Sequence, residues 1–314
     1  MPTDWVPMLR HRRLIAGLSA AFALALAGCG TPTADAPPPE QTRVVKHAKG
    51  EAHVPRTPQR VVVLDTGELD SVLALGVKPI ATVLPDANTQ IQPYLAEKAG
   101  PVDIVGTIGS PDLEKIAALK PDLILSSKTR DDEHYEALNT IAPTVFAETV
   151  GKTWKENFRL NAEALGKSAE ADRLLADYQA RATEIGKHAA GRQVSMLRFI
   201  PGDIRLYNKG SFIGSILADA GLNRPPNQLG DKTFTKLSRE QISQADGDML
   251  FYAAYGDNAR EQMNQVTGSV QWTTLGAVRA GQAFEVPDDT WYLGLGPIAA
   301  NLVLDDLEKK VAPR

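Results

Sequence analysis

Arg198 is the side chain whose place in the sequence most clearly requires a chemical partner. It lies between Leu197 and Phe199 in an apolar segment, and an arginine buried in a strand rarely stays unpaired. Arg205 and Tyr207 follow and alternate with apolar neighbours, so a strand there would present both on one face. Guanidinium groups bind anionic oxygen atoms through charge-assisted hydrogen bonds. The sequence leaves a structural salt bridge and a ligand contact both open for Arg198.

Signatures of catalysis and of direct metal binding are missing from the sequence. The histidines form no ligand cluster, which argues against a site for a bare zinc or manganese ion: they are His11, His47, His53, His134 and His188. There is no Gly-x-Ser-x-Gly elbow, P-loop or complete Gly-x-Gly-x-x-Gly motif. We therefore predict no enzyme, no cofactor and no direct metal ligands. The alternative from another class is an exported α/β hydrolase with His134 or His188 as its base.

Three pairs of neighbouring carboxylates also lack a catalytic arrangement. They are Asp131–Asp132, Asp288–Asp289 and Asp305–Asp306. Adjacent side chains point apart, so we expect each pair to be solvated at the surface.

Cys29 is the only cysteine of the chain and closes an export signal. Basic residues at positions 10–13 precede an apolar stretch at 14–27, which is typical of a signal peptide and too short for a stable membrane span. Leu26-Ala27-Gly28-Cys29 resembles the lipobox of bacterial lipoproteins, in which the cysteine becomes the lipidated first residue. We therefore predict an extracytoplasmic protein, lipid-anchored at the outer face of the cytoplasmic membrane. An ordinary signal peptide is the alternative.

The composition of the remaining chain fits a two-lobed globular protein. Removing residues 1–28 leaves 286 residues with 31 basic and 37 acidic side chains, a net charge of −6, which argues against a nucleic-acid partner. Residues 29–43 contain four prolines and little to bury, and we interpret them as the lipidated cysteine and a tether.

Short apolar runs alternate with helical patterns along the rest of the chain. This alternation predicts α/β architecture with largely parallel sheets, interrupted at 154–190 by a strand-free connector with a long helix. Leu175, Tyr178 and Ala182 mark one apolar face of that helix. The simplest fold class is therefore α/β, with two Rossmann-like lobes at 44–153 and 191–314 bridged by one long helix.

The two halves contain a corresponding segment. Glu114 and Glu240 each open a short helix and precede by eight residues an aspartate that leads into a strand, Asp122 or Asp248. Ser238 and Gln241 have the spacing of a capping box. A glutamate in a first helical turn also stabilises the helix dipole and needs no other role.

The chain resembles the substrate-binding lipoproteins of iron-siderophore ABC importers, relatives of the ferric-dicitrate, ferrichrome and cobalamin binding proteins. The resemblance covers nearly all of the chain after Cys29. The segments that carry it are Thr57–Leu64, Ala74–Ile80, Leu113–Ile124, Ser211–Leu217 and Ala220–Pro225. It implies a ligand cleft between the two lobes, capture of a ferric siderophore there, and delivery to an ABC permease dimer. It also implies a monomeric protein with small closure motions about the bridging helix. It also implies that Glu114 and Glu240 dock to arginine pockets of the permease.

The resemblance directs attention to arginines and aromatic residues at strand ends, where α/β clefts form. We predict that eight residues bind the ligand: Arg198, Tyr207, Trp291, Arg205, Tyr255, Arg130, Thr66 and Glu68. Because few cationic groups are clearly placed among the aromatics, a hydroxamate-type siderophore is favoured over a catecholate or citrate. A cobalamin or haem carrier of the same fold is the alternative within the class.

Overall fold

The computed structural model describes residues 41–86, 88–189 and 191–311. The predicted signal peptide and Cys29 lie outside the described residues. The described chain begins with an antiparallel hairpin of β1 (Thr42–His47) and β2 (Gly50–Pro55). Thr42 and Arg43, which we assigned to the tether, therefore belong to a strand.

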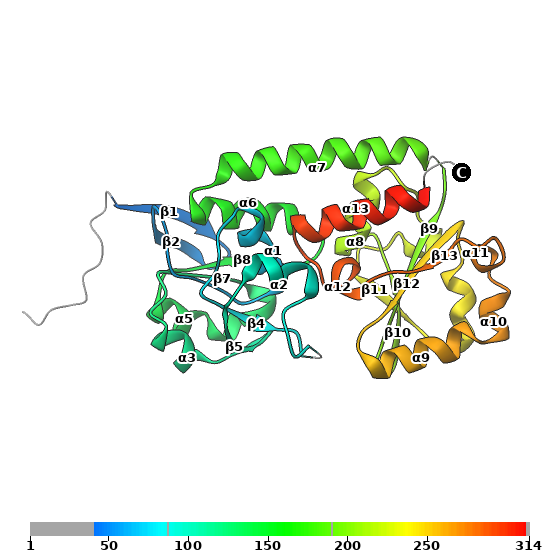
Figure 1. The fold of residues 1–314 in the computed structure, drawn as a ribbon, viewed down its shortest axis with the longest axis horizontal. Helices are drawn as coiled ribbons and strands as arrows, with labels where there is room; N and C mark the ends of the chain where they lie inside the picture. The colour runs from blue at the N-terminus through cyan, green and yellow to red at the C-terminus, as the bar shows by residue number, and fades with distance from the viewer. Residues whose placement is uncertain (1–40, 87, 190, 312–314) are drawn as a thin grey trace, which may run out of the picture. The chain divides into compact units, whose positions relative to one another are not determined.

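The first lobe is built on a six-stranded sheet with the order β6-β5-β4-β3-β7-β8 (Figure 1). All of its pairings are parallel except β5 with β6. The strands are β3 (Val61–Val63), β4 (Ala81–Leu84), β5 (Asp103–Thr107), β6 (Ser110–Pro111), β7 (Leu123–Ser127) and β8 (Thr144–Ala147). The helices are α1 (Thr66–Ala74), α2 (Pro93–Ala99), α3 (Leu113–Ala118), α4 (Lys128–Asp131), η2 (Asp132–His134) and α5 (Tyr135–Ile141).

Two helices without an intervening strand follow this lobe. They are α6 (Trp154–Leu165) and the 21-residue α7 (Ser168–His188). Gly166 ends α6 with a φ of 73°, a left-handed conformation that glycine adopts without a steric cost. The predicted apolar face of α7 is buried at Leu175, Tyr178 and Ala182, because those positions recur every three to four residues.

The second lobe has a five-stranded sheet with the order β11-β10-β9-β12-β13. Its strands are β9 (Val194–Ile200), β10 (Asp203–Tyr207), β11 (Phe234–Leu237), β12 (Met249–Ala254) and β13 (Ala283–Glu285). Its helices are α8 (Phe212–Asp219), η3 (Pro226–Gln228), η4 (Arg239–Ala245), α9 (Asp257–Thr267), α10 (Val270–Thr273), α11 (Gly276–Arg279), α12 (Asp288–Trp291) and α13 (Pro297–Val311).

The second sheet is mixed, which corrects the prediction of largely parallel sheets. β10 pairs antiparallel with both β9 and β11, whereas β12 is parallel to β9 and β13. The cause is the connection Pro201-Gly202 between β9 and β10. Two residues suffice for a hairpin but not for a crossover to a parallel strand, and Gly202 has the positive φ (78°) common in hairpin turns.

One hydrophobic core joins both sheets to the connector helices. It contains Val63 and Leu125 of the first sheet, Tyr178 of α7, and Met196 and Phe251 of the second. Helix α13 lies beside α7 and also contacts α1 (Figure 1). The Asp70 carboxylate on α1 accepts hydrogen bonds from the backbone N–H groups of Ile298 (2.8 Å) and Ala299 (2.9 Å), and so caps α13. The lobes are thus joined by specific polar contacts as well as by a shared core.

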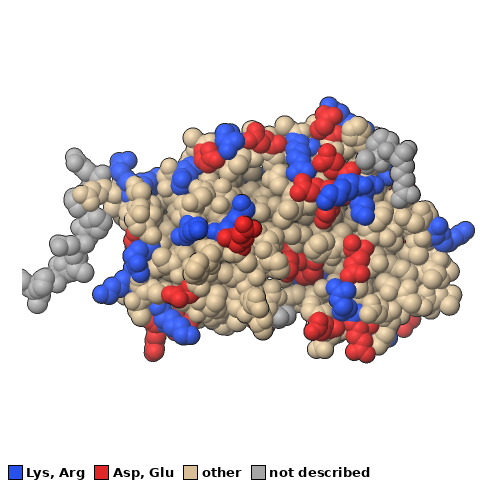
Figure 2. All heavy atoms as spheres, in the orientation of Figure 1, with Lys and Arg blue, Asp and Glu red and all other residues tan. Residues whose placement is uncertain are grey.

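The surface shows no large region of one charge on the face in Figure 2, where basic and acidic side chains are interspersed. Within the described part of the chain, we find no helix with the length and apolar character to cross a bilayer.

Candidate ligand-binding site

A cavity of about 290 Å³ lies between the two lobes. The first lobe contributes residues that follow the carboxyl ends of its strands, and the second contributes residues of β9, β10, β11, α8 and α12 and of the adjoining loops. The lining is Thr66, Ile108, Arg130, Val150, Gly151, Arg198, Arg205, Tyr207, Phe212, Ile213, Thr233, Phe234, Trp291, Tyr292, Leu293 and Leu295. The cavity therefore brings together six of the eight residues predicted to bind the ligand, and leaves out Glu68 and Tyr255.

Arg198 and Arg205 lie directly opposite each other on the antiparallel strands β9 and β10. Both therefore occupy the same face of the sheet, and Tyr207 shares it two residues further on. Two like charges in opposite positions repel, so each needs a nearby anion.

Arg198 satisfies this need with a buried salt bridge. Its Nε and Nη2 atoms donate to the two carboxylate oxygens of Asp288, both at 2.6 Å, and Nη1 donates to the Tyr207 hydroxyl at 3.2 Å. The exposed fractions of the Arg198 and Asp288 side chains are 7% and 10%, so the pair is nearly dry. The structural salt bridge that the sequence left open is therefore present. It also corrects the expectation that Asp288 is solvated.

Arg205 is less completely paired. Its Nη2 lies 3.4 Å from Asp203, a carboxylate that also contacts Lys236 at 2.9 Å, and its guanidinium stacks on Phe234 with 4.1 Å to the ring centroid. The Arg205 Nε is buried and has no hydrogen-bond partner among the described residues. Arg205 thus lines the cavity and carries a donor that the described residues leave unsatisfied.

Arg130 and Thr66 form the polar part of the first lobe's wall. Asp65 caps α1 by accepting from the Thr66 N–H (2.7 Å), and its second oxygen accepts from Arg130 Nε at 2.7 Å. The Thr66 hydroxyl donates across to the Leu293 carbonyl of the second lobe at 2.9 Å. The Asp65 carboxylate therefore fixes both Thr66 and Arg130, because it bonds to each of them.

Glu68 and Tyr255 lie behind the wall rather than in it. Glu68 is buried, and burial, reinforced by the neighbouring Asp65, raises its pKa to about 8. It is therefore mostly neutral at pH 7. The Tyr255 ring packs against the Arg198 guanidinium, 4.9 Å from its Cζ, and supports that side chain from outside the cavity.

Trp291 reaches the cavity from the core. Its side chain is fully buried, stacks on Phe251 with 4.6 Å between ring centroids, and donates through Nε1 to Asp306 at 3.0 Å. The polar atom of the indole is therefore satisfied within the protein.

Sequence reasoning missed several residues of the site. Phe212, Phe234, Leu293 and Leu295 line the cavity, and Asp288 holds Arg198. Strand alternation does not identify them because most follow or precede a strand. Asp131 was also misjudged: it is buried and accepts a 2.5 Å hydrogen bond from the Ser126 hydroxyl.

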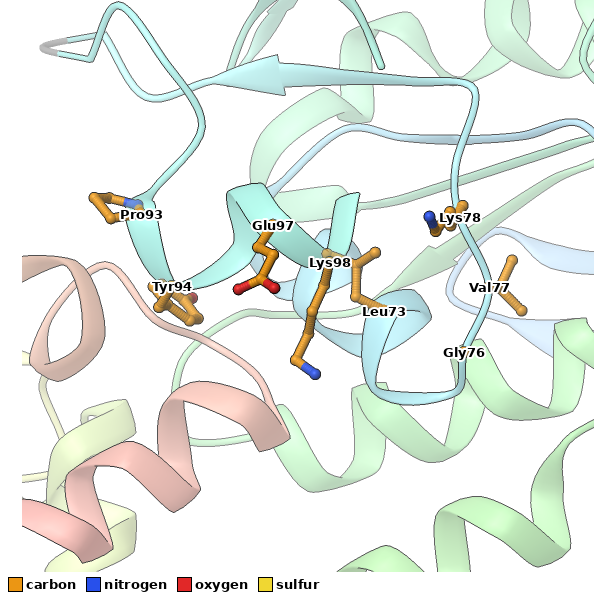
Figure 3. A pocket seen from close by; sticks show the side chains of 8 residues that line it. All are labelled: Leu73, Gly76, Val77, Lys78, Pro93, Tyr94, Glu97 and Lys98. Atoms are coloured by element: carbon orange, nitrogen blue, oxygen red, sulfur yellow. The ribbon is translucent and has the colours of Figure 1, made fainter. Parts of the chain in front are cut away.

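A larger cavity, of about 490 Å³, lies away from these residues between α1 and α2 (Figure 3). Its charged lining residues are Lys78, Glu97 and Lys98, and none of the eight predicted residues is among them. We place the site in the cavity between the lobes because it combines arginines of both lobes with aromatic rings of the second lobe.

Glu114 and Glu240 are both exposed, one on each lobe. Glu114 is in the first turn of α3, which Asp112 caps, and Glu240 is in the first turn of the 3₁₀ helix η4. The capping box predicted from Ser238 and Gln241 is present.

Comparison with known proteins settles the family. The family model described as periplasmic binding protein matches residues 61–290. This chain belongs to that family. A probable siderophore-binding lipoprotein of Bacillus subtilis, YfiY, is 40% identical over 284 residues, which cover 85% of this chain and 87% of that protein.

Other relatives extend the comparison. The achromobactin-binding periplasmic protein of Dickeya dadantii is 30% identical over 80% of this chain and 86% of its own length. The structure of Staphylococcus aureus SirA complexed with staphyloferrin B matches with a TM-score of 0.79 and 32% identity, covering 86% of this chain and 98% of SirA. The two-lobe fold and the family inferred from sequence are confirmed, and the family is one of binding proteins rather than enzymes.

Proposed function

We propose that this protein captures a ferric siderophore outside the cytoplasm and delivers it to an ABC import permease. The observation that carries the proposal is the interlobe cavity, in which arginines of both lobes converge with aromatic rings of the second lobe. Such a wall suits a bulky iron chelate, because guanidinium groups donate to chelate oxygens while rings contact its organic periphery. The relatives named as binding siderophores or ferric citrate support the same class of ligand.

The charge pattern of the cavity supports the hydroxamate type favoured from sequence. Arg130 pairs with Asp65 and Arg198 with Asp288, so two of the three lining arginines are already neutralised. The aromatic side chains Tyr207, Phe212, Phe234 and Tyr292 cover much of the remaining wall. A wall of paired charges and rings fits a chelate of low charge better than a highly charged catecholate or citrate complex.

Transport follows from binding and release, with no covalent step. The iron enters as part of the ligand. Exposed Glu114 and Glu240, one on each lobe, are the proposed docking residues for the permease dimer. Cys29 is the proposed lipid anchor, which would hold a monomer at the outer face of the membrane.

Titration of the purified protein with ferric desferrioxamine B, ferric enterobactin, ferric citrate, haem and cobalamin tests the ligand. We expect saturable quenching of tryptophan fluorescence by a ferric siderophore. Saturation by haem or cobalamin alone, or by none of the five ligands, would overturn the proposed function.

Uptake of ⁵⁵Fe by cells tests the transport role separately. Glu114→Ala combined with Glu240→Ala should abolish uptake while the ligand affinity of the purified protein stays unchanged, because neither glutamate lines the cavity. Cys29→Ser should move the protein from the membrane fraction to the soluble fraction. Uptake at the wild-type rate in the double variant would remove the docking role.

A further inference from the structure

Arg224 is a buried arginine behind the second lobe's wall of the cavity. Its exposed fraction is 8%, and it lies in the loop between α8 and η3. Its Nη2 donates to the Tyr207 carbonyl and to the Gln228 side-chain oxygen, the latter at 2.6 Å. Gln228 in turn donates to the Ser195 hydroxyl at 2.7 Å, so the guanidinium is held in place by neutral groups.

The described part of the chain supplies no carboxylate to balance this charge. Among the described residues Arg224 forms no ion pair, and its Nε and Nη1 are buried without a hydrogen-bond partner. Burial lowers its pKa to about 10, which leaves the group charged at neutral pH. An unpaired buried cation is costly to the folded protein, and its retention calls for an explanation outside folding stability.

The other arginines at the cavity differ in this respect. Arg130 and Arg198 each have a carboxylate of their own, and Arg205 shares Asp203 with the exposed Lys236. Arg224 is shielded from solvent, so its field is screened by little besides protein.

Two tyrosines that line the cavity, Tyr207 and Tyr292, connect it to Arg224. Arg224 bonds to the main chain of Tyr207, and the Tyr207 ring packs edge-on against Tyr292 at 4.8 Å between centroids. The Tyr292 hydroxyl lies 3.1 Å from the Leu197 carbonyl and 3.3 Å from the Phe251 carbonyl, which fixes this ring against β9 and β12. The cation therefore bonds to the main chain of a residue whose side chain lines the cavity.

We propose that Arg224 is a specificity-determining residue that selects a hydroxamate chelate of net negative charge, such as one that carries an additional carboxylate. This inference rests on the proposed function and extends it. Arg224 does not touch the ligand. It adds a fixed positive potential to a wall in which Arg130 and Arg198 each pair with a carboxylate, so a negative chelate gains from it and a positive one loses.

A pair of probes with one chelating core tests this proposal. Ferric desferrioxamine B carries one positive charge on its free ammonium group, and its N-succinyl derivative carries one negative charge instead. Both are titrated against the wild type, Arg224→Met and Arg224→Lys, with Arg239→Met as the control. Arg239 is an exposed arginine that, like Arg224, donates to a glutamine side chain.

The wild type and Arg224→Lys should bind the negative chelate more tightly than the positive one. In Arg224→Met the ratio of these two affinities should fall about tenfold. Arg239→Met should keep the wild-type ratio. The Arg224→Met variant should melt no lower than Arg224→Lys, because removing an unpaired buried charge relieves a desolvation cost.

Several results would overturn the proposal. Equal losses of both affinities in Arg224→Met would assign the residue a structural role. Affinities equal to those of the wild type would assign it no role in binding. A wild type that prefers the positive chelate contradicts the selection itself. Failure of the wild type to bind either chelate would overturn the proposed hydroxamate ligand and, with it, the role of Arg224. The proposed function would still stand if another ferric siderophore bound in the five-ligand titration.

Discussion

The two walls of the interlobe cavity are built in different ways. The first lobe presents Thr66 and Arg130 from the first turns of helices that follow parallel strands, with Asp65 holding both. The second lobe presents Arg198, Arg205 and Tyr207 from the faces of antiparallel strands. The Arg198 side chain of the second wall is 7% exposed, whereas the Arg130 side chain of the first wall is 30% exposed. We therefore expect substitutions in the second wall to disturb stability and binding together, and those in the first wall to act mainly on binding.

Arg198→Ala should have the largest effect. It leaves Asp288 buried without its partner, which should lower the free energy of unfolding by about 3–5 kcal/mol and abolish ligand binding. Chemical denaturation and fluorescence titration measure the two effects. The double variant Arg198→Met with Asp288→Leu removes both charges and should recover most of the stability but not the binding. A stable Arg198→Ala protein would show that the pair is solvated and that the contrast between the walls is wrong.

Arg130→Ala should cost less stability and still weaken binding. The Arg130 side chain is 30% exposed, so water can enter where it stood, and the buried Asp65 keeps its hydrogen bond from the Thr66 N–H. We therefore expect a loss of about 1–3 kcal/mol. The ligand affinity should fall about tenfold or more, since a charged donor at the cavity is removed. Arg130→Lys is the matched control and should retain most of the stability. An affinity equal to that of the wild type would place the ligand against the second wall alone.

Glu68→Gln should change how stability depends on pH. The pKa of Glu68 is raised from 4.5 to about 8, first by burial and then by Asp65. Between these values the folded protein holds a proton that the unfolded chain has released, so the free energy of unfolding falls as the pH rises. Melting curves at pH 5 and pH 8 should therefore show a smaller drop for the variant than for the wild type. Parallel drops would mean that Glu68 is ionised throughout.

Trp291→Phe should have the smallest effect. It removes the hydrogen bond to Asp306, worth about 1 kcal/mol, and keeps an aromatic ring against Phe251. Because the indole is fully buried, the ligand affinity should change by less than about threefold. A tenfold loss of affinity at unchanged stability would show that the ligand reaches this ring.

The sequence predicted the lobes, the connector and the strand faces because hydrophobic periodicity reports them directly. The regular spacing of Leu175, Tyr178 and Ala182 identified α7, and alternation placed Arg198, Arg205 and Tyr207 on strands that the structure contains. Hydrophobic periodicity does not show which side chains from distant segments of the chain pair with each other. In the sequence Asp288 is one of two adjacent carboxylates that we expected at the surface. The fold places it against Arg198, which lies 90 residues earlier in the chain. The hairpin of β1 and β2 was missed because its strands mix charged and apolar residues in short runs.

The position of iron tests the central claim most directly. Crystals of the protein grown with ferric desferrioxamine B, measured at the iron absorption edge, locate the metal by its anomalous scattering. We expect one peak between the lobes, in the cavity lined by Thr66, Arg205 and Tyr207. A peak in the cavity between α1 and α2, beside Lys78 and Lys98, would contradict the assignment of the site.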